Sequence, residues 1–360
     1  MPVVSRACAI AIAALAASCS GSGRATSPAI EPVLATAAVA NDADDPAIWI
    51  DAADPERSLI VATNKAAAPD GGLYVFGLDG AIRQIVTPLD RPNNVDVEYG
   101  LMTPAGPIDI AVTTERLRSQ LRVYRIDEHG LVPVDGGGIK VLDGETSERA
   151  MPMGISLYRR PGDGAIFAIV APKAGGTTNY LAEYRLTFDA AAGVVRGSLV
   201  RRFGNFSGTG EIEAVAVDDA LGYVYYADEE YAIRKWSADP DHPDAGRELA
   251  VFGRDGFTRQ REGIAIVGRA DGTGVIVCND QMPGGSALHL YRREGQPGQP
   301  HAHDPAVTVV STASDSTDGI DATSTSLGPT FRGGLLVMMN SRGQNFQFYD
   351  LAALLKSASR

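Results

Sequence analysis

A strand-like string recurs six times along the 360 residues of this chain. Each copy is a short apolar run that contains an aromatic residue and ends near charged residues, and the copies begin at Leu73, Leu121, Leu181, Tyr231, Ala287 and Phe346. Successive copies are 48, 60, 50, 56 and 59 residues apart, and two further apolar runs precede each one. Repeats of this length with three or four strands each predict an all-β fold, a six-bladed β-propeller. Two β-sandwiches would not repeat one unit six times at a nearly constant period.

Turn signals and composition favour the same fold. Eight Asp-Gly pairs interrupt the apolar runs, and the chain contains 40 Gly and 21 Pro, as expected for short strands joined by tight turns. A helical period occurs only near the end of the chain, at residues 351–355. The chain has 32 basic and 44 acidic residues and a formal charge of -12, which argues against a nucleic-acid partner.

The first residues have the layout of an export signal. Arg6 precedes an apolar run over residues 7–17, which is too short to span a bilayer as a helix. Small residues then lead to Cys19 in a string similar to a bacterial lipobox, so we expect residues 1–18 to be a signal peptide and Cys19 to be acylated. Ordinary cleavage to a soluble product is the alternative.

The expected location and domain boundaries follow from this signal. Residues 19–40 are rich in Ser, Gly, Ala and Pro and are expected to form a flexible tether before a propeller domain over residues 41–360. We expect an exported protein that is periplasmic, held at the outer membrane by a lipid anchor, or secreted. A closed propeller has no exposed sheet edge that requires a partner, so we expect a monomer.

Polar residues occupy matching positions in the repeats. Before the first strand of each unit stand Asp44 and Asp45, Asp96, Met153, Glu213, Glu262 and Asp318. After the second strand stand Lys65, Arg116, Lys173, Glu229, Gln281 and Asn340. In an antiparallel pair, the residue entering the first strand and the residue leaving the second lie at the same end. We therefore expect these positions to ring one mouth of the central channel.

The predicted ring combines several carboxylates with a short arc of basic residues. Two carboxylates about 4 Å apart repel by about 4 kcal/mol at an effective dielectric of about 20, so converging acids need raised pKa values or a bound cation. Carboxylate and amide oxygens without His or Cys are the ligands of a hard ion, and Ca²⁺ suits ligands from separate loops better than Mg²⁺. The alternative for each single acid is that it caps a turn between strands.

The strings around these positions resemble those of the β-propeller phytases, secreted bacterial enzymes that remove phosphate from inositol hexakisphosphate with Ca²⁺. The resemblance covers residues 41–350 and keeps the order of the family. The matching strings are Asp42-Ala43-Asp44-Asp45-Pro46-Ala47-Ile48-Trp49, Thr63-Asn64-Lys65, Asn93-Asn94-Val95-Asp96-Val97, Ala227-Asp228-Glu229-Glu230, Arg261-Glu262-Gly263 and Ser316-Thr317-Asp318-Gly319-Ile320-Asp321.

The resemblance implies a role for each ring residue. Glu213, Glu229, Glu262 and Asp318 would hold the calcium ions of the cleavage site, with Asp44 beside them. Asp45 would anchor a structural ion, and Gln281 would supply an amide oxygen. The predicted set of metal ligands also contains Asp96 and Asn340. Lys65, Arg116 and Lys173 would bind the phosphate groups of phytate or another polyphosphorylated inositol. The implied mechanism is direct attack on phosphorus by a calcium-activated water, without a phosphoenzyme.

The chain departs from the family pattern at several positions. Met153 stands where the family has Tyr, Glu98 where it has Arg, and Ala174 where an acid is common. Thr312 and Asn340-Ser341-Arg342 replace expected carboxylates. Two alternatives therefore stay open: a phytase-like propeller that binds anions with altered or lost activity, and a propeller lactonase-type hydrolase with a single divalent ion.

Overall fold

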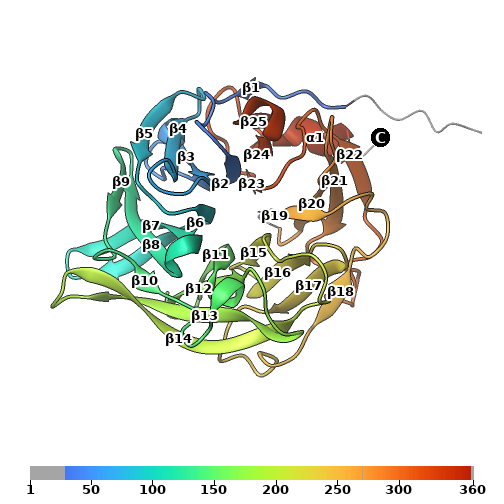
Figure 1. Cartoon of the computed structure of the whole chain (residues 1–360). Coiled ribbons are helices and arrows are strands. Elements are labelled where there is room, and N and C mark those ends of the chain that lie inside the picture. The colour runs from blue at the N-terminus through green and yellow to red at the C-terminus, as the bar shows by residue number, and fades with distance from the viewer. Residues whose placement is uncertain (1–28, 270, 358–360) are drawn as a thin grey trace, which may run out of the picture.

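The computed structural model describes residues 29–269 and 271–357. The strands of this part form six antiparallel sheets around a central axis (Figure 1). The prediction of an all-β, six-bladed propeller is confirmed. The α-helix of the described part, α1 (Leu351–Ser357), follows the last strand where the sequence predicts a helical turn. The predicted signal peptide over residues 1–18 and the acylation site Cys19 lie outside the described residues.

The blades follow one another along the chain, and the first strand of each lies next to the axis (Figure 1). Blade 1 contains β2 (Ala43–Trp49), β3 (Leu59–Asn64), β4 (Gly72–Gly77) and β5 (Ile82–Val86). Blade 2 contains β6 (Pro92–Thr103), β7 (Gly106–Glu115), β8 (Gln120–Asp127), β9 (Gly130–Pro133) and β10 (Ile139–Lys140). Blade 3 contains β11 (Pro152–Arg159), β12 (Ile166–Pro172), β13 (Thr178–Asp189) and β14 (Val194–Asn205).

The second half of the ring has the same construction. Blade 4 contains β15 (Val215–Asp218), β16 (Tyr223–Asp228), β17 (Ala232–Ser237) and β18 (Ala250–Phe252). Blade 5 contains β19 (Arg261–Gly268), β20 (Gly274–Asp280), β21 (Ala287–Arg292) and β22 (Thr308–Ser311). Blade 6 contains β23 (Ile320–Thr323), β24 (Leu335–Asn340), β25 (Asn345–Asp350) and β1 (Leu34–Ala35). Short 3-10 turns occur at Pro55–Arg57, Arg116–Arg118, Ser147–Ala150 and Ser341–Gly343.

An N-terminal strand closes the ring. In blade 6, β1 pairs with β25, with Leu34 opposite Phe348, and the backbone NH of Val33 donates to the carbonyl of Phe348 at 2.8 Å. The sequence predicts a flexible tether over residues 19–40, and this expectation is wrong for residues 30–36, which belong to the propeller. A strand of two residues leaves no periodic pattern, so composition alone could not distinguish it from a linker.

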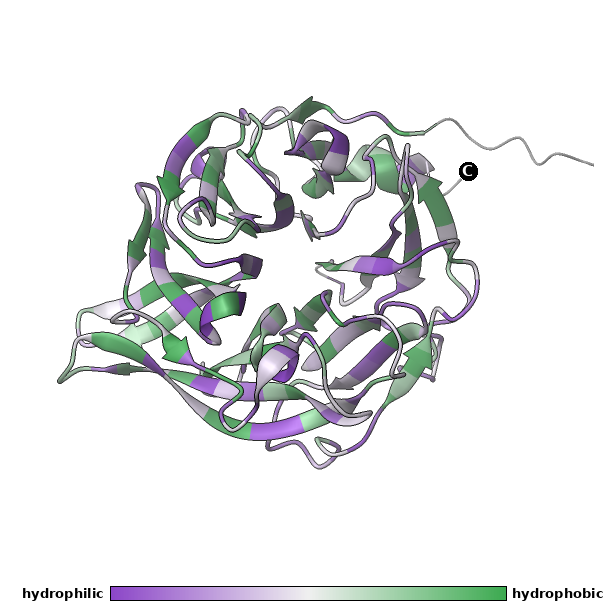
Figure 2. Ribbon diagram, viewed as in Figure 1, coloured by the Kyte–Doolittle hydropathy of each residue, from purple (hydrophilic) through white to green (hydrophobic). Residues whose placement is uncertain are grey.

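The core lies between the blades. Six clusters of buried apolar side chains each join two neighbouring blades. Successive residues of a strand point to opposite faces of its sheet, so Ile60 and Ala62 of β3 pack toward blade 6 while Leu59 and Val61 pack toward blade 2. Figure 2 shows the resulting mixture of hydrophobic and hydrophilic residues along the strands. No helix of the described part is long and apolar enough to cross a bilayer.

Candidate active site

Equivalent backbone hydrogen bonds place the predicted ring residues at one end of the blades. In each blade, the residue that follows the second strand donates its NH to a carbonyl between one and five residues before the first strand. The six bonds join Lys65 to Asp42, Arg116 to Arg91, Lys173 to Met151, Glu229 to Glu211, Gln281 to Gln260 and Ser341 to Asp315, over 2.8 to 3.3 Å. The antiparallel pairing expected from the sequence therefore holds in every blade.

A cavity of about 390 Å³ opens at this end of the propeller. Its lining residues come from blades 1, 4, 5 and 6: Lys65, Gly210, Glu211, Glu213, Glu229, Gln260, Glu262 and Asp318. Five of these residues were predicted from the sequence as site residues: Lys65, Glu213, Glu229, Glu262 and Asp318. Segments separated by up to 253 residues thus meet in one polar cavity.

Each predicted basic residue contacts an acid. Nζ of Lys65 lies 2.5 Å from Oδ1 of Asp44 and 3.9 Å from Oδ2 of Asp318. Nη2 of Arg116 lies 3.5 Å from Oε1 of Glu213.

Two further contacts complete the mouth. Lys173 forms an ion pair with Glu211, and the amide nitrogen of Gln281 donates to Oδ1 of Asp318. The cavity and these contacts thus unite Asp44, Lys65, Arg116, Lys173 and Gln281 with the predicted acids.

The acids of the cavity have raised pKa values. Burial raises the pKa of Glu213 to about 7, and Asp44 adds to this effect. Burial also raises the pKa of Glu229 to about 8, helped by the charges of Glu213 and Glu211. The pKa values of Glu262 and Asp318 lie well above the ordinary range, again because of burial and then of neighbouring carboxylates. These carboxyl groups therefore hold their protons more tightly than free acids do as long as no added positive charge stabilises their ionised form.

The pKa values of Lys65 and Arg116 shift in opposite directions. Burial alone would lower the pKa of Lys65, but the carboxylates of Asp44, Glu213 and Asp318 raise it well above its usual value. Burial lowers the pKa of Arg116, whose Nε is buried without a hydrogen-bond acceptor. Its Nη2 contacts the sulfur of Met153. Arg116 is therefore a buried cation with donors left for an anionic ligand.

The donor set fits a hard cation. Asp44 is 1% exposed, and its Oδ2 accepts no hydrogen bond. Such a buried carboxylate oxygen is costly unless a positive charge or a donor satisfies it. In the described residues, no three or more His, Cys, Asp or Glu side chains are arranged so that they could hold a metal ion as they stand. Lys65 and Arg116 contact Asp44, Asp318 and Glu213 in this arrangement and offset part of the charge of these acids.

Strand irregularities decide which predicted residues reach the mouth. In blade 2 the register of β6 and β7 shifts between Pro92 and Val95, and equivalent shifts occur in blades 1, 3 and 5. Such a bulge re-aims the side chains beside it. Asn93, and not Asp96, consequently lies at the Asp44 position: its amide nitrogen donates to Oε2 of Glu213 at 3.3 Å.

Asn340 is likewise outside the residues that line the cavity. Its amide oxygen accepts from the NH of Asp315 at 3.1 Å, and its amide nitrogen donates to Asn345 at 2.8 Å. Asn340 is the last residue of β24, as Glu115 is of β7, so Ser341 takes the position that Lys65 and Arg116 hold in their blades. The amide of Asn340 therefore stabilises the turn after β24 through these two hydrogen bonds.

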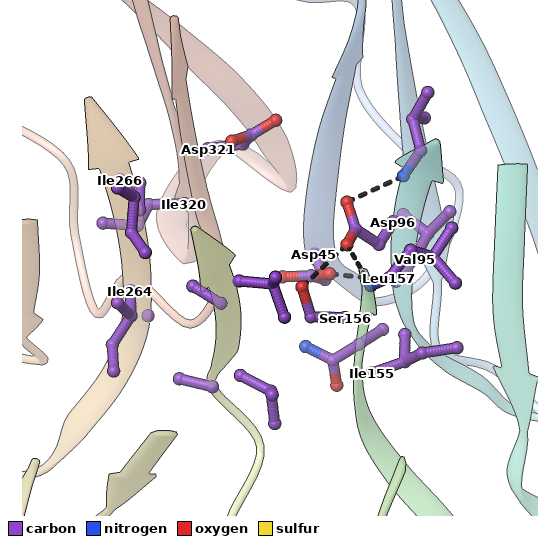
Figure 3. Close-up of a pocket in the computed structure, with 18 of the residues that line it drawn as sticks. Asp45, Val95, Asp96, Ile155, Ser156, Leu157, Ile264, Ile266, Ile320 and Asp321 are labelled. Atoms are coloured by element: carbon purple, nitrogen blue, oxygen red, sulfur yellow. Dashed lines mark hydrogen bonds between the residues drawn. The ribbon is translucent and has the colours of Figure 1, made fainter. Parts of the chain in front are cut away.

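Asp45 and Asp96 lie deeper, in a cavity of about 180 Å³ on the propeller axis (Figure 3). Oδ2 of Asp45 accepts from the NH of Val95 at 2.9 Å, and Oδ2 of Asp96 accepts from Ser156 and Leu157 at 2.8 and 2.7 Å. Burial raises the pKa of both acids. The sequence analysis thus placed in one ring acids that lie in two separate cavities. Glu262 lines both cavities.

Four residues of the mouth were not among the predicted site residues. Gly210, Glu211 and Gln260 line the larger cavity, and Asn93 bonds to Glu213. The interval of 48 residues between the first two repeats, counted from Asp44, leads closer to Asn93 than to Asp96. Glu211 and Gln260 each lie two residues before a predicted acid, but no pattern in the sequence separates them from loop residues.

The fold and this site define a β-propeller whose mouth is suited to an anionic substrate and a hard cation. The chain matches the Phytase family over residues 3–348. It is 30% identical to a 3-phytase of Bacillus subtilis (strain 168) over 310 residues, which are 84% of this chain and 75% of that protein. The chain therefore belongs to the phytase family and is a β-propeller phytase, an enzyme that hydrolyses phosphate esters of phytate.

Similar solved structures are much more distant. U3-55K is 10% identical with a TM-score of 0.46, over 82% of this chain and 73% of that chain. The β-propeller domain of Cps50 (Swd1) from Myceliophteria thermophila has the same identity and TM-score, over 89% of this chain and 99% of that chain. These likenesses are too low to support any statement about function.

Proposed function

We propose that this phytase depends on calcium and that hydrolysis takes place in the cavity at the mouth of the propeller. The observation that supports this proposal is the buried Asp44 carboxylate with an unsatisfied oxygen, beside four acids with raised pKa values. Asp44, Glu213, Glu229, Glu262 and Asp318 would hold calcium.

The remaining predicted ligands divide into two groups. Gln281 contacts Asp318 and belongs to the mouth, whereas Asp45 belongs to the axial cavity and would anchor a separate structural ion. We leave Asp96 and Asn340 out of the proposed ligands, because both carboxylate oxygens of Asp96 and the single amide oxygen of Asn340 accept hydrogen bonds from the protein.

The basic residues would bind and orient the phosphate groups. Arg116 offers several donors in one plane, which suits the oxygens of a phosphate group, and its burial strengthens each hydrogen bond. Lys65 and Lys173 would add point charges on either side. Holding a phosphate group in one orientation lowers the entropic part of the barrier to hydrolysis.

The acids would set the local charge. A cluster that combines Glu213, Glu229 and Glu262 repels a polyanion unless positive charge is added, so binding of substrate and cation should be mutually dependent. When bound, calcium would neutralise charge on the phosphoryl oxygens and lower the pKa of a water molecule. Asn93 would keep Glu213 in position through its hydrogen bond.

Phosphate release from phytate tests the proposal. We expect activity in Ca²⁺, none after removal of metal with a chelator, and recovery on adding Ca²⁺ back. Glu262→Gln should lose most of its activity at every Ca²⁺ concentration. Glu230→Gln is the matched control, because Glu230 is exposed and lies outside the cavity lining. Full activity in chelator, or an unimpaired Glu262→Gln variant, would contradict the proposal.

We also propose that the protein is exported and acylated at Cys19. The supporting observation is the charged, apolar and small-residue order of positions 1–19. Labelling with radioactive palmitate in a bacterial host should mark the wild type and not a Cys19→Ala variant. Label in both proteins, or in neither, would exclude acylation at this residue.

A further inference from the structure

The ion pair between Lys173 and Glu211 differs from the other two ion pairs at the mouth, because its acid is not a proposed cation ligand. Lys65 and Arg116 contact Asp44 and Glu213, which are proposed cation ligands. A bound cation would draw these acids away and release the basic side chains. Glu211 is not among the proposed ligands, so a cation would not release Lys173 in this way.

Backbone contacts fix Glu211 in position. Its NH donates to Oε2 of Glu229 at 2.8 Å, and its carbonyl accepts from the NH of Glu229 at 3.3 Å. The preceding residue, Gly210, has φ of 72°, and a Cβ there would lie 3.0 Å from Oε2 of Glu229. Glycine at position 210 therefore favours this close approach to Glu229, and Glu211 lies beside Lys173.

The two partners remain open to ligands. The side chain of Lys173 is 24% exposed and that of Glu211 is 30% exposed. The negatively charged carboxylate of Glu211 thus binds an accessible ammonium group, as a negatively charged phosphate oxygen would. An ion pair with this exposure is weak enough to be exchanged.

We propose that Glu211 is a specificity-determining residue that competes with phosphate for Lys173. The inference rests on the proposed function of the cavity. Glu211 neutralises the charge of Lys173, so a phosphate group gains less from contacting this lysine, which disfavours retention of free inorganic phosphate, the product of the reaction. A phytate molecule held at several of its phosphate groups is displaced less easily. Glu211 therefore limits product inhibition at the cost of some substrate affinity.

Kinetics with the variant Glu211→Gln test this inference in the calcium-loaded protein. Removing the charge frees Lys173, so the inhibition constant of inorganic phosphate and the KM for phytate should both fall roughly fivefold, the effect of one partly exposed ion pair. kcat should change by less than twofold. Glu230→Gln removes the same charge from a neighbouring exposed position and should change neither constant.

A double variant separates competition from positioning. With Lys173→Met already present, Glu211→Gln should no longer tighten phosphate binding, as measured by calorimetric titration with inorganic phosphate. An unchanged or raised inhibition constant in Glu211→Gln would overturn the inference, as would an effect that persists without Lys173. Because calorimetry needs no turnover, it tests Glu211 even if the wild type proves independent of calcium, which is the separate failure of the proposed function.

Discussion

The ammonium group of Lys65 lies 2.5 Å from Oδ1 of Asp44, so the first basic residue of the site is paired with its most buried acid. The side chain of Asp44 is 1% exposed and that of Lys65 is 14% exposed. A cation bound by Asp44 would compete with Lys65 for the same carboxylate. Binding of a cation at Asp44 is therefore coupled to the position of Lys65.

Removing Lys65 should destabilise the metal-free protein and strengthen its binding of calcium. In Lys65→Met the buried Asp44 loses its ion pair with Lys65, and breaking such a pair costs about 3 kcal/mol. Urea unfolding in chelator measures this loss, and the Ca²⁺ midpoint of restabilisation should be lower than in the wild type. Lys140→Met, at an exposed lysine of β10, should change stability by less than about 0.5 kcal/mol. Equal stability of Lys65→Met and wild type in chelator would exclude this coupling.

The repeat in the sequence predicted which segments meet, and side-chain chemistry predicted most of the mouth. Lys65, Glu213, Glu229, Glu262 and Asp318 line one cavity because each lies at or near the end of one of the two inner strands, on the same side of its blade. This much depends on strand pairing, whose period of two residues is visible in the sequence.

The remaining errors concern the exact position of a residue along its strand. Asn93 lies in the bulge between Pro92 and Val95 and reaches the mouth, whereas Asp96 lies three residues further along on the axis. Asn340 still belongs to β24, so the residue that follows this strand is Ser341. A one-residue shift changes the side on which a side chain emerges without changing composition. The contact of Lys173 with Glu211 could not be predicted either, because it depends on loop geometry between two blades.

A close approach of neighbouring blades beside Glu213 gives a second prediction. A Cβ on Gly154 would lie 2.2 Å from the carbonyl oxygen of Glu213, so Gly154→Ala must push the two backbones apart. We expect activity to fall at least tenfold and the melting temperature to drop, because the displaced Glu213 leaves Asn93 and Arg116. Gly162→Ala is the matched control, since no atom lies within 4 Å of a Cβ built there. Normal activity of Gly154→Ala would show that the site tolerates the shift.

Arg116 should be more sensitive to a conservative change than an exposed arginine nearby. Lysine cannot reproduce the planar set of donors, and the buried Nε of Arg116 has no acceptor within the protein. Arg116→Lys should raise the KM for phytate roughly tenfold, the loss of about one strong hydrogen bond to a charged group. Arg118→Lys, at an exposed arginine paired with Asp90, should leave KM unchanged. Initial rates over a range of phytate concentrations distinguish the two, and equal KM values would argue against phosphate binding by Arg116.

Carboxylic acids on the propeller axis should make the metal-free protein less stable as the pH rises. Burial, and then the neighbouring Asp219, raises the pKa of Glu98 to about 9, whereas burial raises the pKa of Asp219 to about 6. In the unfolded chain such acids have pKa values of about 4, so the folded protein binds more protons than the unfolded chain between the unfolded and the folded pKa. Stability from these groups is complete below the unfolded pKa and is lost as the pH rises toward 9.

Glu98→Gln should remove part of this dependence. The amide mimics the protonated acid, and its oxygen can still accept from the NH of Tyr99, which donates to Glu98 at 2.7 Å. Each proton contributes at most about 1.4 kcal/mol per pH unit, so urea unfolding in chelator at several values between pH 6 and 9 resolves the change in slope. Glu128→Gln, at an exposed glutamate, is the control. If Glu98→Gln and wild type lose stability with the same slope, Glu98 does not hold a proton in the folded protein, and its carboxylate must instead be charged on the axis.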